Sequence, residues 1–67
     1  MIKLSINGEE KQFPEPQAVA ELIASMGLIG KRIALECNGE IVPRSQFATH
    51  LLQDGDTIEI VVAVGGG

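Results

Sequence analysis

The side chains that could do chemistry in this 67-residue chain lie mainly in its second half: Cys37, His50, Asp54 and Asp56. An imidazole can ligate a metal or act as a general base, and two neighbouring carboxylates can divide acid and base roles. His50 is the only histidine and has no cysteine nearby in the sequence, which favours a surface loop residue over a metal ligand or a base. The sequence therefore predicts no metal site and no catalytic centre, and we do not expect an enzyme.

The other three residues have structural interpretations. Asp54 and Asp56 flank Gly55, and aspartate side chains bond local backbone amides in turns, so this spacing favours a turn over a paired-carboxylate site. Cys37 ends an alternating apolar run over 33–37, which predicts a small buried side chain. A reactive thiol would need an activating base, and no such base is visible.

The end of the chain offers a different kind of chemistry. Gly65, Gly66 and Gly67 follow the longest apolar run, 60–64, and no helix follows them to make a phosphate-binding loop. A terminal carboxyl group with a pKa of about 3.3–3.7 is inert at neutral pH, but it becomes an acyl donor once another enzyme adenylates it. Three glycines extend about 10 Å without side chains, so a flexible tail over 65–67 suits delivery of this group into a narrow active site. A frayed or engineered end is the alternative.

The first half of the chain predicts a hairpin and a helix. Apolar and polar residues alternate over 2–6, and Asn7-Gly8 fits a type I′ turn that returns the chain as a strand over 9–13. The stretch 17–26 is the only clear helix, because apolar residues recur there at i, i+3, i+4 and i+7. These residues are Val19, Leu22, Ile23 and Met26. Gly27 fits a left-handed residue after the helix, whereas no capping residue marks the helix start.

The second half predicts three strands. Alternation over 33–37, a second Asn-Gly turn and a short segment over 40–42 indicate another hairpin, which Pro43 closes. Residues 45–52 fit either a helical turn or a compact loop. The final strand, 58–64, is apolar on nearly both faces, and such a strand belongs in the middle of a sheet. We therefore expect it beside the first strand and parallel to it.

Together these elements predict an α+β fold. One helix has to cover the apolar face of the sheet, and residues 45–52 are too few for the second helix of a ferredoxin-like fold. The economical arrangement is a β-grasp, the ubiquitin-like roll, in which a mixed sheet of four to five strands packs on one main helix. The β-grasp domain is expected to span residues 1–64, with 65–67 as its tail.

Composition narrows the possible partners. The net charge is −4 and the only aromatic residues are Phe13 and Phe47, which argues against nucleic acid as a partner. The run 60–64 is far below the ~20 residues that span a bilayer, and no signal peptide is visible. A single cysteine indicates a reducing compartment, so we expect a soluble cytoplasmic domain. We also expect the free protein to be a monomer. Lys31 and Arg32 are expected in a solvated loop.

Six stretches distributed over the chain carry a family resemblance. They are Asn7-Gly8-Glu9, Val19–Ile23, Ile41–Ser45, Asp54-Gly55-Asp56, the strand 58–64 and the terminal Gly65-Gly66-Gly67. In this order and at this length they resemble the ThiS family, the sulfur carrier proteins of thiamine biosynthesis. The resemblance covers essentially the whole chain.

The resemblance implies that the chain is a co-substrate of other enzymes. An adenylating enzyme of the ubiquitin-activating type would couple the Gly67 carboxylate to AMP from ATP, and sulfur from a cysteine desulfurase persulfide would displace AMP. Thiazole synthase would then take the sulfur of the Gly67 thiocarboxylate into the thiazole ring. Val64, Gly65 and Gly66 would enter the partner with the terminus. The carrier would bind no cofactor itself, since its partners use the ATP and the persulfide.

Three alternatives remain open. The sulfur carrier subunit of molybdopterin synthase shares the fold and the tail but is typically longer. A ubiquitin-like modifier would join Gly67 to lysines of target proteins, and a plain β-grasp interaction module would have a dispensable tail. An isopeptide-linked ladder in cell extracts would indicate the modifier, whereas a thiocarboxylate would indicate the carrier.

Overall fold

The computed structural model describes residues 1–63 of the chain. The predictions for Val64 and for the glycine tail over 65–67 fall outside this range. Within residues 1–63, no helix is long and apolar enough to cross a membrane.

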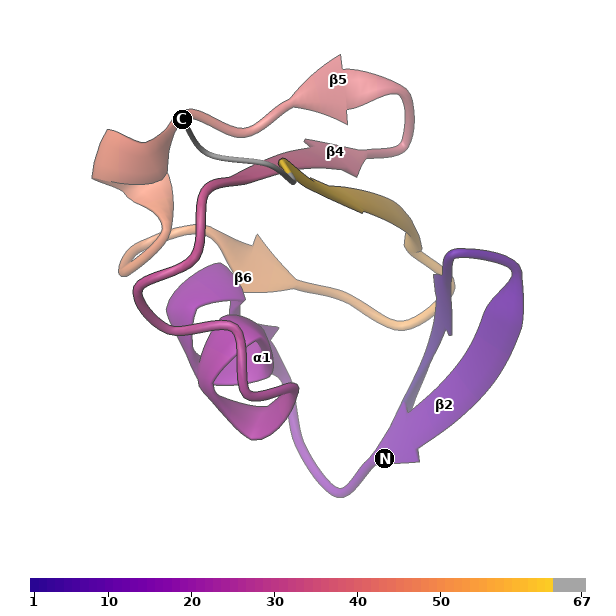
Figure 1. The fold of residues 1–67 in the computed structure, drawn as a ribbon. Coiled ribbons are helices and arrows are strands. Elements are labelled where there is room, and N and C mark those ends of the chain that lie inside the picture. The colour runs from indigo at the N-terminus through magenta and orange to yellow at the C-terminus, as the bar shows by residue number, and fades with distance from the viewer. Residues whose placement is uncertain (64–67) are drawn as a thin grey trace.

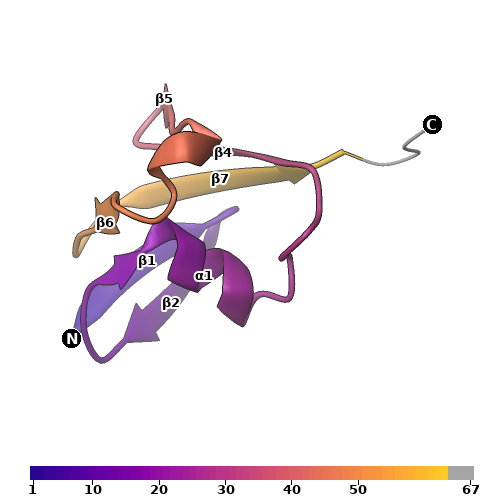
Figure 2. The same cartoon turned by 90° about the vertical axis from the view of Figure 1, so that its left-hand side faces the viewer.

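A five-stranded mixed sheet with one helix against one face forms the body of the molecule (Figure 1). Its strands, in the order β2-β1-β7-β4-β5, are Glu9–Phe13, Ile2–Ile6, Thr57–Val62, Ile33–Cys37 and Glu40–Ile41. The last strand, β7, occupies the centre, parallel to β1 and antiparallel to β4 (Figure 2). The predicted β-grasp and the predicted neighbour of the last strand are both confirmed.

Both predicted hairpin turns have the backbone geometry of a type I′ turn. The φ angles are +51° at Asn7 and +85° at Gly8, and +53° at Asn38 and +85° at Gly39. Asparagine tolerates this left-handed region better than other residues that carry a side chain, and glycine enters it freely. These turns set the register of β1 with β2 and of β4 with β5, so the bounds of β1, β2 and β4 agree with the sequence prediction.

The helix is shorter than predicted. The helix α1 spans Val19–Ser25, and the two residues before it form a short strand, β3 (Gln17–Ala18), which pairs antiparallel with β6 (Leu51–Leu52). Tertiary pairing thus overrides the helical pattern at its first two positions. The start of α1 is capped by Glu21, whose carboxylate accepts the backbone N–H of Ala18 at 2.8 Å.

The stretch 45–52 combines a helical turn with a strand. A 3₁₀ turn, η1, spans Arg44–Gln46, so of the two alternatives left open by the sequence a helical turn is present, and it begins one residue earlier. The chain then reaches β6, a strand that the sequence did not predict. Phe47, between the two, packs against the core as a partly buried residue.

The hydrophobic core lies between α1 and the covered face of the sheet. Its members come from β1, α1, β4, β6, β7 and the residue after β5: Ile2, Leu4, Ile6, Val19, Leu22, Ile23, Leu35, Cys37, Val42, Leu52, Ile58 and Ile60. Met26 packs on the core as the predicted end of the helical stripe, and Gly27 follows with a φ of +72°, as predicted. The final strand was expected over 58–64, with apolar residues on nearly both faces. It ends at Val62 instead, and the face away from the core is exposed at Val61.

Candidate functional site

The site predicted from the sequence, Val64 to Gly67, lies outside the described residues, but the structure shows what presents it. The central strand β7 leads directly to this segment. It pairs with β4 along five positions, from Cys37 opposite Ile58 to Ile33 opposite Val62. One residue later, the N–H of Ala63 donates to the carbonyl oxygen of Arg32 at 2.8 Å. The backbone is therefore anchored in the sheet as far as the last described residue.

A side chain extends the pairing of β7 beyond the end of β1. The chain turns away at Asn7, and the Asn7 amide takes the place of a strand partner. Its Oδ1 accepts the N–H of Ile60 at 2.7 Å, and its Nδ2 donates to the carbonyl oxygen of Ile60 at 3.2 Å. The sequence indicated only the turn at Asn7, because the partner residue is 53 positions away and the sheet order decides the contact.

The second turn asparagine holds the start of β7. The Asn38 N–H donates to the carbonyl oxygen of Thr57 at 2.7 Å, and the Asn38 Oδ1 accepts the Thr57 N–H at 2.9 Å. The Asn38 Nδ2 also donates to Asp56 at 3.0 Å, and the N–H of Gln53 donates to the same carboxylate at 2.9 Å. Asp56 is therefore a turn residue, as predicted, and it ties the β4–β5 turn to the loop before β7.

These donors lower the pKa of Asp56. Burial by itself raises the pKa of this carboxyl group, but the hydrogen bonds from the Gln53 amide, the Asn38 side chain and the Cys37 thiol oppose it, together with the charge interaction with His50. The balance sets the pKa of Asp56 below its ordinary value of 3.8. Hydrogen bonds to the ionised form favour it over the neutral acid.

We expect Asp56 to make folding sensitive to acid. A folded-state pKa below the unfolded-state value of about 3.9 stabilises the fold above that pH, and this contribution is lost as the pH falls through the folded-state pKa. Urea unfolding at a series of pH values should show Asp56→Asn to be less stable than the wild type at pH 7, with a gap that narrows in acid. Glu15→Gln, in the exposed loop after β2, is the control and should keep the wild-type acid dependence. A gap of constant size would contradict this role.

Cys37 is buried and its thiol is protonated at neutral pH. It is 8% exposed in the core, as predicted. Burial, the charge of Asp56 and the hydrogen bond from the Cys37 Sγ to Asp56 Oδ2 at 3.6 Å raise the pKa of the thiol to about 11. Because the thiolate is the nucleophile, this cysteine is unsuited to carry sulfur as a persulfide.

Cys37→Ala should weaken the fold without stopping sulfur transfer. Removing one buried sulfur atom leaves a small cavity, and we expect a loss of about 1 kcal/mol in the free energy of unfolding. Denaturant unfolding measures the loss, and intact mass after incubation with the sulfur-transfer enzymes measures the transfer. A folded variant that accepts no sulfur would make Cys37 part of the chemistry.

The remaining sequence candidates do not converge on a catalytic arrangement. Asp54 lies in a turn, as predicted, but its carboxylate accepts the backbone N–H of Lys3, 51 residues away, at 2.7 Å. His50 is half-buried beside β6 and lines a cleft of about 350 Å³ with Cys37 and Asp56, so the fold brings together residues that the sequence separates. Within residues 1–63, no three His, Cys, Asp or Glu side chains are placed to hold a metal ion.

The fold and its last strand define a class of protein. The mixed sheet of five strands with one helix against it is the β-grasp fold, the ubiquitin-like roll, which solved ThiS structures share. This chain belongs to the ThiS family, whose model matches residues 4–67.

Individual relatives support this assignment. The chain is 35% identical to the sulfur carrier protein ThiS of Escherichia coli over 66 residues, which cover 98% of this chain and 100% of that protein. The crystal structure of a thiamine biosynthesis protein (ThiS) from Geobacter metallireducens matches with a TM-score of 0.83 and 29% identity, over 98% of this chain and 100% of that one. The chain is thus a sulfur carrier of thiamine biosynthesis and not itself an enzyme.

A second kind of relative is much longer. The chain is 44% identical to a thiazole synthase of Paramagnetospirillum magneticum over 98% of its own length, but it spans only 20% of that protein. In this relative, a segment similar to the whole of this chain is part of the same polypeptide as a thiazole synthase.

Proposed function

We propose that this chain carries sulfur as a thiocarboxylate on Gly67 and donates it for thiazole formation. The observation that carries the proposal is that the family match includes the glycine tail, since it runs to residue 67. In support, the strand before the tail is held on both sides, by the Asn7 amide and by β4. A rigid strand followed by a few glycines holds the terminal carboxylate within a limited distance of the domain.

The chemistry proceeds in two stages on partner enzymes. An adenylating enzyme of the ubiquitin-activating type joins the Gly67 carboxylate to AMP, and pyrophosphate leaves ATP. A persulfide from a cysteine desulfurase attacks the acyl carbon and displaces AMP. A thiol then cleaves the sulfur–sulfur bond and leaves the thiocarboxylate. No side chain of residues 1–63 takes part in bond making. The carrier instead contributes a surface that its partner enzymes recognise and a terminus that extends into their active sites without obstruction by side chains.

We further propose a division of labour within the chain. Residues 1–64 act as the folded domain and 65–67 as the tail, with Val64, Gly65 and Gly66 entering the partner together with Gly67. The four residues after Ala63 span at most about 13–14 Å, so Gly67 can reach into a channel without unfolding β7. Thiazole synthase is the proposed sulfur acceptor, because a segment like this chain is part of a thiazole synthase in one relative. A reducing cytoplasm suits a thiocarboxylate and a lone cysteine.

Intact mass spectrometry tests the proposal. The chain is incubated with the adenylating enzyme, ATP, a cysteine desulfurase and cysteine, and we expect a gain equal to the exchange of one oxygen for one sulfur. Sulfur should then pass to thiazole synthase and return the mass to its starting value. Transfer to molybdopterin synthase instead would favour the runner-up carrier, and an isopeptide bond to lysine would favour a modifier.

A further inference from the structure

A cleft at the end of β7 has no role in the chemistry described so far. It has a volume of about 540 Å³ and is lined by Arg32, Ile33, Ala34, Arg44, Val61 and Ala63, which together we call the arginine cleft. Its floor is apolar, since Ala34 and Val61 face each other across β4 and β7, and Val61 is 66% exposed. Its two cations come from different elements, Arg32 from the loop before β4 and Arg44 from η1.

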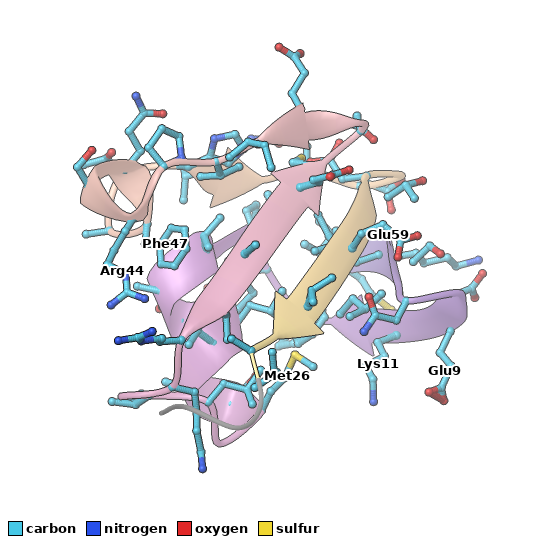
Figure 3. The ribbon with its side chains drawn as sticks, turned by 45° about the horizontal axis from the view of Figure 1, so that its top comes forward. Glu9, Lys11, Met26, Arg44, Phe47 and Glu59 are labelled. Carbon is cyan, nitrogen blue, oxygen red and sulfur yellow. The ribbon has the colours of Figure 1, made fainter. Side chains whose placement is uncertain are left out.

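Three of the five basic residues, Lys31, Arg32 and Arg44, line this cleft or the one beside it. The chain has nine Asp and Glu residues, all within the described part, yet none of them lines the arginine cleft. A neighbouring apolar cleft shares Ile33 and Arg44, is also lined by Lys31, and likewise has no carboxylate in its lining. Figure 3 places Arg44 on the opposite side of the molecule from Lys11 and Glu9. The surface where β7 ends is thus cationic and apolar, and the paired Glu36 and Glu59 lie two residues further along the same face of β4 and β7.

Guanidinium groups at such a place are suited to bind carboxylates. The planar guanidinium binds a carboxylate through two parallel hydrogen bonds, and an exposed valine beside it offers apolar contact. The complementary surface is a segment that carries Asp or Glu next to an apolar side chain.

The short reach of the tail places this surface against any enzyme that receives Gly67. Ala63 lines the arginine cleft, and Gly67 is at most about 13–14 Å from it along an extended chain. An enzyme that receives Gly67 in an internal site must therefore bring the rim of that site against the cleft. The sulfur acceptor has to do this at every turnover.

We propose that the arginine cleft docks an acidic rim of thiazole synthase, with carboxylates on Arg32 and Arg44 and an apolar side chain on Ala34 and Val61. This inference rests on the proposed function, and it goes further by naming the surface and the chemistry of its partner. Thiazole synthase is chosen because one relative joins a segment like this chain to it in a single polypeptide. Charge complementarity across such a contact favours rapid and specific docking.

Charge reversal tests the proposal with the intact chain and purified thiazole synthase from the same source. The double variant Arg32→Glu/Arg44→Glu should raise the Kd by about tenfold or more, because like charges across an interface are strongly unfavourable. The double variant Lys3→Glu/Lys11→Glu changes the net charge equally on β1 and β2 and should leave the Kd near that of the wild type. Circular dichroism confirms that both variants fold. The Kd of the wild type should also rise with salt concentration, and this dependence should be weaker in the arginine double variant.

Cross-linking locates the partner residues. Arg44→Lys keeps the positive charge and supplies an amine, which a carbodiimide joins to a carboxylate in contact with it. We expect a cross-linked peptide that contains an Asp or Glu of thiazole synthase, and its absence would argue against the contact.

The other outcomes are distinguishable from one another. If the wild type binds and the arginine double variant binds equally well, this inference is wrong while the proposed function stands. If the wild type does not bind thiazole synthase, both are wrong. A loss of binding confined to the adenylating enzyme would assign the cleft to that partner instead. If the double variant changes only the titration of the Gly67 carboxylate in the free protein, the occupant is the chain's own terminus.

Discussion

One alanine added after Gly67 is expected to remove most thiocarboxylate formation while the fold stays unchanged. The addition moves the reacting carboxylate by one residue, or about 3.3–3.6 Å in an extended chain. Adenylation requires the reacting atoms to be about 3–3.5 Å apart, and a misplacement of about 1 Å already costs on the order of a hundredfold in rate. The alanine also brings a side chain into the innermost part of the channel, which otherwise receives only glycine.

Thiocarboxylate yield, measured by intact mass, tests this expectation. Removal of Gly67 should lower the yield in the same way, because the carboxylate then stops short of the nucleotide. An alanine added before Met1 is the matched control, since it lengthens the chain equally at the other end and should leave the yield intact. All of these variants should melt at the same temperature. Full yield from the chain extended after Gly67 would show that the position of the terminus is not recognised.

Ile58→Ala is expected to unfold much of the protein. Ile58 is completely buried at the centre of the sheet, opposite Ile6 of β1 and Cys37 of β4. A large-to-small change at a buried aliphatic residue costs about 2–5 kcal/mol, and a domain of this size has a total stability of only about 3–10 kcal/mol. Since about 1 kcal/mol shifts the melting temperature of such a domain by roughly 4–8 °C, we expect a fall of at least about 10 °C.

Thermal and urea unfolding measure this effect. Val61→Ala is the control on the same strand, because Val61 is 66% exposed on the open face and its truncation should change stability by no more than about 0.5 kcal/mol. If both substitutions had similar effects, the core would not depend on the covered face of β7. A stable Ile58→Ala variant would be equally inconsistent with the central position of this strand.

The sequence by itself determined the main elements and their arrangement. The two Asn-Gly turns are local, because positive φ angles at adjacent residues are required there and few residue pairs accept them. Period-two alternation then set the bounds of β1 and β4, and the apolar character of the last strand placed it in the middle of the sheet. The burial of Cys37 followed from the same alternation. The glycine tail is also evident from the sequence alone, and its role stays a prediction, because the structure describes residues 1–63.

Only the tertiary structure decided the contacts between distant segments. The pairing of β3 with β6 involves two residues on each side, and a strand of two residues has no periodicity to detect. The Asn7 amide on Ile60 and the Asn38 side chain on Asp56 join residues 53 and 18 positions apart. Arg32, just before β4, and Arg44, the first residue of η1, share a cleft with Val61 and Ala63 at the end of β7. Turns and alternation are properties of neighbouring residues, whereas these contacts depend on the order of strands in the sheet, which the whole chain fixes through the packing of its core.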